Sequence, residues 1–132
     1  MTQKTAAALM FQNGDAEEAM TFYMSLFDDS KVVFAERFAA GEPGPEGTIK
    51  MASFTLAGQE YFCMDSSIRH GFTFTPSISL FVTCESEEEL TRLYAALMEG
   101  GEALMPLDSY GFSKKFGWVQ DRFGVSWQLN LP

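Results

Sequence analysis

Residues 116–129 read Phe-Gly-Trp-Val-Gln-Asp-Arg-Phe-Gly-Val-Ser-Trp-Gln-Leu, the pattern of two short strands joined by an Asp-Arg-Phe-Gly turn. Aromatic and β-branched residues fill both arms, and Gly124 accepts the positive φ that such a turn often needs. The second arm and the residues after it alternate between apolar and polar positions: Val125, Trp127, Leu129 and Leu131 against Ser126, Gln128 and Asn130. Because successive strand residues point to opposite faces, we expect the apolar set in a core and Gln128 in a cleft or at the surface.

The chain before this hairpin follows one order of elements twice. Strand patterns cover residues 6–11, 31–38, 48–56 and 59–65 in the first half, and residues 76–84, 103–107 and the hairpin arms in the second. Each half also has a helix pattern that begins with a capping residue, Asp15 or Ser86, and an acidic first turn. Asp15–Tyr23 aligns with Ser86–Tyr94, which supports an internal repeat. The sequence therefore predicts an α+β chain with two tandem βαβββ modules, residues 1–66 and 76–132, within a single domain 1–132.

Composition and charge restrict the classes of partner. The chain has 132 residues, enough for one domain with its own core, and a formal net charge of −9 with no basic patch. This charge argues against nucleic acid and anionic membranes as partners. No stretch is long enough to cross a membrane, and the apolar run near the start is interpreted as a strand, not a signal peptide. Cys63 and Cys84 lie in apolar strand patterns without Cys-x-x-Cys spacing, so we expect two buried thiols in a reducing cytoplasm.

Five stretches of the chain resemble the vicinal oxygen chelate superfamily, which includes glyoxalase I, bleomycin resistance proteins and extradiol dioxygenases. They are Leu9–Tyr23, Gly41–Gly47, Phe72–Pro76, Ser79–Val82 and Gly117–Gly124. The closer likeness is to the PhnB-like branch, often labelled 3-demethylubiquinone-9 3-methyltransferase, and it covers nearly the whole chain. The resemblance implies mixed sheets curled into a cup that holds the active site. It also implies a homodimer, because pairing of chains or modules usually completes the cups.

Metal-dependent members of the superfamily place His, Gln or Glu in the first and last strands of each module. The matching positions in this chain are Ala8, Phe62 or Met64, Ser77 or Ser79, and Gln128. A divalent ion needs several converging nitrogen or oxygen donors, and a single amide oxygen is a poor ligand. We therefore expect no metal site and no cofactor.

An apolar pocket with a few polar groups is expected on the concave side of the sheets. Its candidate residues are Phe62, Met64, Ser79, Phe81, Trp118 and Gln128. The apolar ones are equally consistent with an ordinary core, and Gln128 either hydrogen-bonds a ligand or satisfies a neighbouring backbone group. Within the strand expected over residues 76–84, Ile78 and its alternate neighbours should face a helix, opposite Ser79 and Phe81.

The remaining signals leave the function open between two classes. His70, the only histidine, lies in the link between the modules, where a general base is conceivable but an exposed loop residue is favoured by the scarcity of partners. The first class is metal-independent binding of a small, partly hydrophobic or aromatic molecule. The second is a glyoxalase-like enzyme acting on an unidentified small metabolite. A third reading, a purely structural dimer module, would fit a cup that is filled by its own side chains. Methyl transfer is not supported, because no glycine-rich turn follows the first strand and the chain is too short for a doubly wound nucleotide-binding fold.

Overall fold

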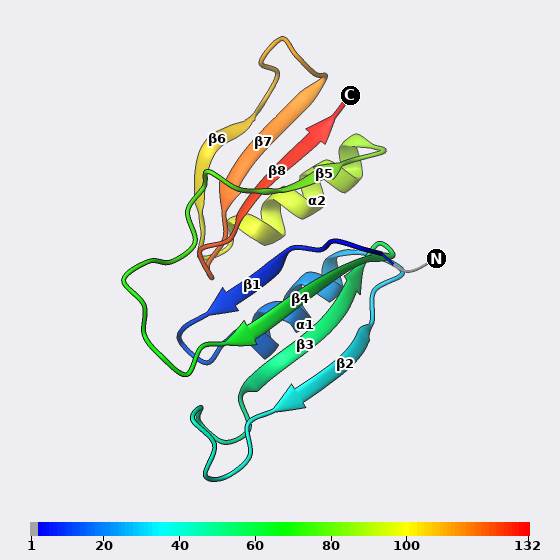
Figure 1. Cartoon of the computed structure of the whole chain (residues 1–132). Coiled ribbons are helices and arrows are strands. Elements are labelled where there is room, and N and C mark those ends of the chain that lie inside the picture. Colours follow the sequence, from blue (N-terminus) through cyan, green and yellow to red (C-terminus); the bar gives the residue numbers. More distant parts are fainter. Residues whose placement is uncertain (1–2) are drawn as a thin grey trace. The chain divides into compact units, whose positions relative to one another are not determined.

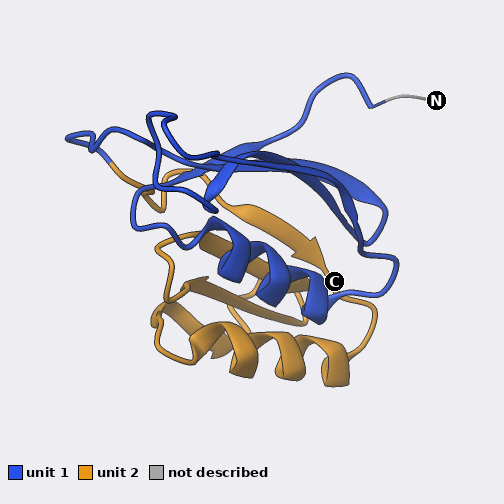
Figure 2. Cartoon of the chain, turned by 90° about the horizontal axis from the view of Figure 1, so that it is seen from below, with its two compact units in different colours: residues 1–72 blue, residues 73–132 orange. Residues whose placement is uncertain are grey.

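The computed structural model describes residues 3–132 and divides the chain into two compact units, Met1–Phe72 and Thr73–Pro132. Each unit contains one four-stranded sheet and one helix (Figure 1). In both units the helix lies along one face of its own sheet, as Figure 2 shows. The chain is therefore α+β with two mixed sheets, as predicted.

Unit 1 follows the order strand, helix, strand, strand, strand. Its elements are β1 (Ala8–Phe11), α1 (Ala16–Leu26), β2 (Val32–Arg37), β3 (Ile49–Leu56) and β4 (Gln59–Asp65). The order across the sheet is β1-β4-β3-β2. Strand β1 runs parallel to β4, and the other neighbouring pairs are antiparallel. Because β2 is the last strand in this order, it forms one edge of the sheet.

Unit 2 repeats this arrangement. Its elements are β5 (Leu80–Thr83), α2 (Glu87–Met98), β6 (Glu102–Asp108), β7 (Lys115–Gln120) and β8 (Ser126–Leu131). The order across the sheet is β5-β8-β7-β6, with β5 parallel to β8 and the other pairs antiparallel. The same strand order and the same pairing in both units confirm the predicted βαβββ repeat.

The core of unit 2 lies between α2 and the side of β7 and β8 that faces it. Three leucines at helical spacing are fully buried on α2: Leu90, Leu93 and Leu97. Trp127 and Leu129 of β8 are buried as well, which confirms the predicted apolar face of this strand. Each fully buried leucine contributes roughly 1.5–3 kcal/mol relative to an exposed one. Among residues 3–132, neither helix has the length and apolar character needed to span a membrane.

The two helices begin with different caps. At α2 the Ser86 hydroxyl accepts a hydrogen bond from the Glu89 amide at 3.1 Å, as predicted. At α1, Asp15 holds the predicted N-cap position, but its side chain makes no capping hydrogen bond. Asp65, at the end of β4, accepts from the Ala16 amide at 3.0 Å and from the Ile49 amide at 2.8 Å. A buried carboxylate from a distant strand therefore caps α1.

Strand β5 is shorter than predicted, because the strand expected from Pro76 begins only at Leu80. The preceding residues form a turn in which the Ile78 amide donates to the Thr75 carbonyl at 3.4 Å. Proline has no N–H for a ladder, and serine and threonine hydroxyls form local hydrogen bonds that compete with one. Ile78 is 72% exposed, so the expectation that it faces a helix is wrong.

Candidate ligand pocket

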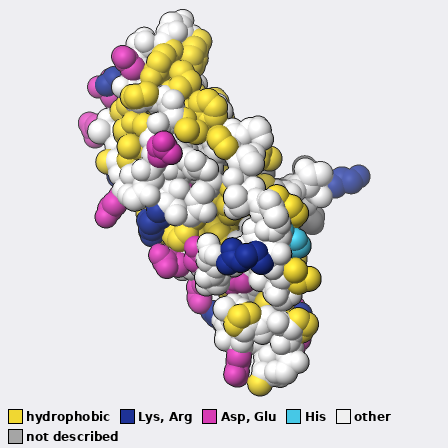
Figure 3. All heavy atoms as spheres, turned by 90° about the vertical axis from the view of Figure 1, so that its left-hand side faces the viewer, with side chains coloured by type: hydrophobic (Ala, Val, Ile, Leu, Met, Phe, Trp, Pro, Cys, Tyr) yellow, Lys and Arg dark blue, Asp and Glu magenta, His cyan; other side chains and the backbone are white. Residues whose placement is uncertain are grey.

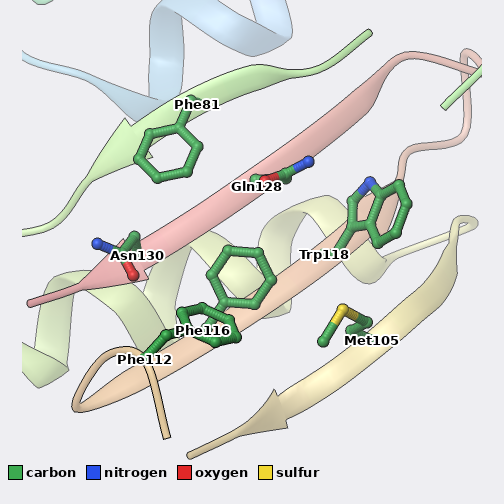
Figure 4. Close-up of a pocket in the computed structure, with 7 residues that line it drawn as sticks. All are labelled: Phe81, Met105, Phe112, Phe116, Trp118, Gln128 and Asn130. Carbon is green, nitrogen blue, oxygen red and sulfur yellow. The ribbon is translucent and has the colours of Figure 1, made fainter. Parts of the chain in front are cut away.

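A pocket of about 370 Å³ lies in unit 2, on the face of the sheet opposite α2 (Figure 4). All four strands and one loop contribute to its lining. Its aromatic residues are Phe81 from β5, Phe112 from the loop after β6, and Phe116 and Trp118 from β7. The other lining residues are Met105 from β6, and Gln128 and Asn130 from β8.

Strand register explains why these side chains meet. Gln128 is paired with Phe81 on one side and with Trp118 on the other. Asn130, two residues along β8, is paired with Phe116. Paired residues and residues two apart on one strand point to the same face of a sheet. The alternation that buries Trp127 and Leu129 therefore directs both amide side chains into the pocket.

The aromatic part of the pocket is reinforced by the loop between β6 and β7. Phe112 meets the ring of Phe116 edge to face, with centroids 5.0 Å apart. Tyr110 stacks on Phe112 at 6.1 Å, and its hydroxyl donates to the Pro106 carbonyl at 2.5 Å. Edge-to-face and offset pairs of this kind are favourable beyond the area they bury. In Figure 3, hydrophobic side chains gather over β6 and the loop that follows it.

A small polar network adjoins the pocket. Ser126 is 2% exposed, and its hydroxyl oxygen accepts from the indole N–H of Trp118 at 2.8 Å. The hydroxyls of Ser79 and Ser126 are 2.6 Å apart, and Gln128 Nε2 donates to Ser79 Oγ at 3.4 Å. This network holds the Trp118 ring in place. It also occupies the indole N–H, which is the only hydrogen-bond donor of that side chain. Ser79 is therefore a hydrogen-bond partner of Gln128 and is not among the residues that line the pocket.

Two predicted pocket residues, Phe62 and Met64, and the histidine His70 belong to unit 1. Phe62 and Met64 are half-buried on β4 in unit 1, where the Phe62 ring lies 6.3 Å from that of Phe34. His70 lies in the segment after β4, with its ring stacked on Phe72 at 4.8 Å. Its backbone amide donates to Gln12 Oε1 at 2.6 Å. The structure thus brings Phe81, Trp118 and Gln128 together within unit 2, whereas Phe62, Met64 and His70 belong to unit 1.

The positions that hold metal ligands in the superfamily do not fit a divalent ion in this chain. Ala8 is paired with Phe62 in unit 1, and Gln128 is paired with Phe81 in unit 2. At the four matching positions (Ala8, Phe62 or Met64, Ser77 or Ser79, and Gln128) the only oxygen donors are the serine hydroxyls and the Gln128 amide, and none of these residues supplies an imidazole or a carboxylate. Within residues 3–132, no group of three or more His, Cys, Asp or Glu side chains is placed to hold an ion.

Sequence reasoning missed four of the lining residues: Met105, Phe112, Phe116 and Asn130. Two of them could have been predicted from strand periodicity. Asn130 lies two residues from Gln128 on one strand, and Phe116 lies two residues from Trp118 on another, so each pair shares a face of the sheet. Met105 lies in a strand with two register shifts against β7, and Phe112 lies in a loop. No periodicity assigns such residues to a face.

The repeated βαβββ units and the pocket on the sheet are the features of the glyoxalase/bleomycin-resistance fold. A solved glyoxylase/bleomycin resistance protein/dioxygenase domain from Frankia sp. EAN1pec shares this fold, with a TM-score of 0.67 and 15% identity over 99% of this chain and 92% of that one. Protein PA1353 from Pseudomonas aeruginosa is more similar, at a TM-score of 0.85 and 26% identity over 98% of both chains. The chain thus has the glyoxalase/bleomycin-resistance fold.

The family within this class follows from two further comparisons. A putative 3-demethylubiquinone-9 3-methyltransferase, PhnB protein, from Bacillus cereus is 56% identical over 98% of this chain and 100% of its own, with a TM-score of 0.96. Residues 3–130 match the 3-demethylubiquinone-9 3-methyltransferase family, and the chain belongs to that family. No curated protein sequence is significantly similar to it.

Proposed function

We propose that this protein binds a small, partly hydrophobic molecule in the pocket of unit 2, without a metal ion. The observation that carries the proposal is a pocket of about 370 Å³ walled by four aromatic rings, with two amide side chains facing it. Ligand sites are typically concave, mostly apolar, and equipped with a few convergent polar groups that orient the ligand.

The hydrogen bonds of Gln128 favour a ligand contact over a role in the fold. Its side chain was expected either to orient a ligand or to satisfy a backbone group. The one hydrogen bond of this side chain among residues 3–132 is the long one to Ser79 Oγ at 3.4 Å. Because no backbone group depends on Gln128, its amide is available to a bound molecule.

Replacing Gln128 by leucine tests this assignment. We expect Gln128→Leu to lower the affinity for a bound compound at least tenfold, while the melting temperature of the free protein stays within about 2 °C of wild type. Compounds would be found by a thermal-shift screen and by mass spectrometry of whatever co-purifies. Gln59→Leu, an exposed amide at the start of β4, is the matched control.

Two results would contradict the proposal. If Gln128→Leu melts well below wild type, its amide supports the fold, as removal of a needed buried partner costs roughly 1–3 kcal/mol. If neither the library nor the purified protein yields any compound whose binding responds to pocket variants, the pocket is not a binding site.

Metal independence is part of the same proposal. The pocket offers amide oxygens and no histidine, thiolate or carboxylate, a poor donor set for zinc, nickel, manganese or iron. We expect elemental analysis of the purified protein to find less than one ion per chain. Turnover of a small metabolite that a chelator abolishes would instead favour the glyoxalase-like enzyme.

Methyl transfer, which the name of the Bacillus cereus relative implies, is not proposed for this chain. Transfer from S-adenosylmethionine usually uses a doubly wound sheet with a glycine-rich turn after its first strand. Here the first strand lies at the edge of a four-stranded mixed sheet. The sequence after it, Gln12-Asn13-Gly14-Asp15, contains one glycine.

We also propose that the protein is a cytoplasmic homodimer. In unit 1 the edge strand β2 is exposed along its whole length and begins with Val32, Val33 and Phe34. An exposed apolar edge strand is a ready site for pairing with a second copy of the chain. Cys63 and Cys84 are both free and buried, which suits a reducing compartment.

A further inference from the structure

The lining of the pocket contains no ionisable side chain. Its polar groups are the carboxamides of Gln128 and Asn130, because the Trp118 N–H is already donated to Ser126. A charged ligand would lose hydration in such a pocket without gaining an ionised partner, and that loss is costly. The formal net charge of −9 further disfavours an anion. The pocket therefore selects a neutral molecule.

The two carboxamides are arranged to meet one edge of a ligand. They lie two residues apart on β8, which places them about 7 Å from each other along the strand. Gln128 Nε2 donates one hydrogen bond to Ser79 Oγ, and Gln128 Oε1 has no hydrogen-bond partner among residues 3–132. The Asn130 side chain makes no hydrogen bond to any described residue, which leaves both a donor and an acceptor. A group that both donates and accepts, such as another amide, matches this pair.

The rest of the pocket is suited to a flat ring system. Phe81, 59% exposed, and Trp118 lie on either side of Gln128, as Figure 4 shows. Aromatic side chains that retain exposed faces gain most from stacking on another planar ring. We infer that the ligand is an uncharged, planar aromatic molecule that carries a carboxamide or lactam group, an inference that rests on the proposed binding function.

Four matched probes test this inference: 2-naphthamide, 2-naphthoate, naphthalene and decahydronaphthalene-2-carboxamide. They separate the neutral amide, the anion, the bare ring and the non-planar amide. Binding is followed by isothermal titration calorimetry, because the naphthalene ring absorbs and emits in the same spectral range as tryptophan.

The expected result is that 2-naphthamide binds at least tenfold more tightly than each of the other three probes. Asn130→Leu and, as a second variant, Asn130→Ala should reduce that affinity at least fivefold while leaving naphthalene binding unchanged. Gln59→Leu should leave both unchanged. Circular dichroism of each variant verifies that it is folded.

The remaining outcomes overturn the inference and separate it from the proposed function. If 2-naphthoate binds as tightly as 2-naphthamide, the inference that the ligand is uncharged is wrong. If naphthalene binds as tightly as 2-naphthamide, Gln128 and Asn130 do not recognise a carboxamide group on the ligand. Equal binding of the decahydro compound refutes the planar ring. If none of the four binds up to its solubility limit, the ligand class is refuted, whereas the binding function fails only if the wider library also yields nothing.

Discussion

Asp121 shows how one side chain organises the hairpin of β7 and β8. It is 4% exposed, and its Oδ1 accepts from the amides of Phe123 and Val125 at 2.9 and 3.0 Å. Its Oδ2 accepts from the indole N–H of Trp127 at 2.9 Å. The same carboxylate thus shapes the turn and holds the largest side chain of the core of unit 2, which in turn sets the face on which Gln128 lies.

We predict that Asp121→Ala destabilises the protein by about 3 kcal/mol. Hydrogen bonds to a charged acceptor are each worth roughly 1.5–3 kcal/mol, and the substitution also leaves a buried indole N–H without this partner. Urea denaturation gives the free energy of unfolding. The control is Asp108→Ala, an exposed aspartate whose one side-chain hydrogen bond is to the adjacent Ser109 amide. Equal stabilities of the two variants would refute this account of the turn.

The two cysteines are the other residues with a direct physical prediction. Burial, assisted by the nearby Asp65 carboxylate, raises the pKa of Cys63 to about 12, and burial and Glu89 raise the pKa of Cys84 to about 11. Because the thiolate is the nucleophile, both thiols should be inert in the folded protein. We expect no adduct by intact mass after iodoacetamide treatment at pH 8, and two adducts in urea. Rapid native labelling would contradict the burial of these groups.

The same pKa shifts have a consequence for stability. Both thiols have a pKa raised above the ordinary value of 9, so folding favours their neutral form. Their contribution is fully present below pH 9, and it is lost as the pH rises from there toward about 11 and 12. Stability in urea should therefore fall above pH 9 and should fall less in the Cys63→Ala variant.

At the scale of elements, the junction of α2 and β6 is unusually tight. A Cβ on Gly101 would lie 2.5 Å from the Gln120 carbonyl oxygen and 2.8 Å from that of Leu97. Both are backbone atoms, so no side-chain rotation relieves the clash. The absence of a side chain at this position lets the end of the helix approach the end of β7.

We predict that Gly101→Ala destabilises the protein by roughly 1–3 kcal/mol, the usual cost of forcing an extra carbon into a packed site. Gly71→Ala is the control, because nothing lies within 4 Å of a Cβ there and its φ needs no glycine. That control should be neutral or slightly stabilising, since alanine reduces the freedom of the unfolded chain. Similar melting temperatures for both variants would show that the junction can relax.

For the whole molecule, the prediction concerns assembly. We expect sedimentation at micromolar concentration to give twice the chain mass of 14.7 kDa. Val33→Lys should shift the protein toward the monomer, because Val33 is 51% exposed on the edge strand β2 and a lysine there opposes strand pairing. Ile68→Lys, at a more exposed position outside any strand, is the control. A wild-type monomer, or a Val33→Lys dimer, would rule out pairing through β2.

The sequence by itself determined the order of the elements and the two faces of the last strand. Local signals carry this information: the alternation that buries Trp127 and places Gln128 on the opposite face, the Ser86 cap, and Gly124, whose φ is +94°. Each depends on residues within one turn or one strand, so it can be predicted without knowledge of the fold.

Only the tertiary structure decided how distant segments meet. The cap of α1 comes from Asp65, 49 residues from Ala16. The pocket brings Phe81 beside Gln128 through a parallel pairing and adds Phe112 from a loop. Strand β5 begins late because turn hydrogen bonds before Leu80 compete with its ladder. Register and loop placement arise from long-range packing, and a shift of one residue reverses every side chain, so no local pattern specifies them.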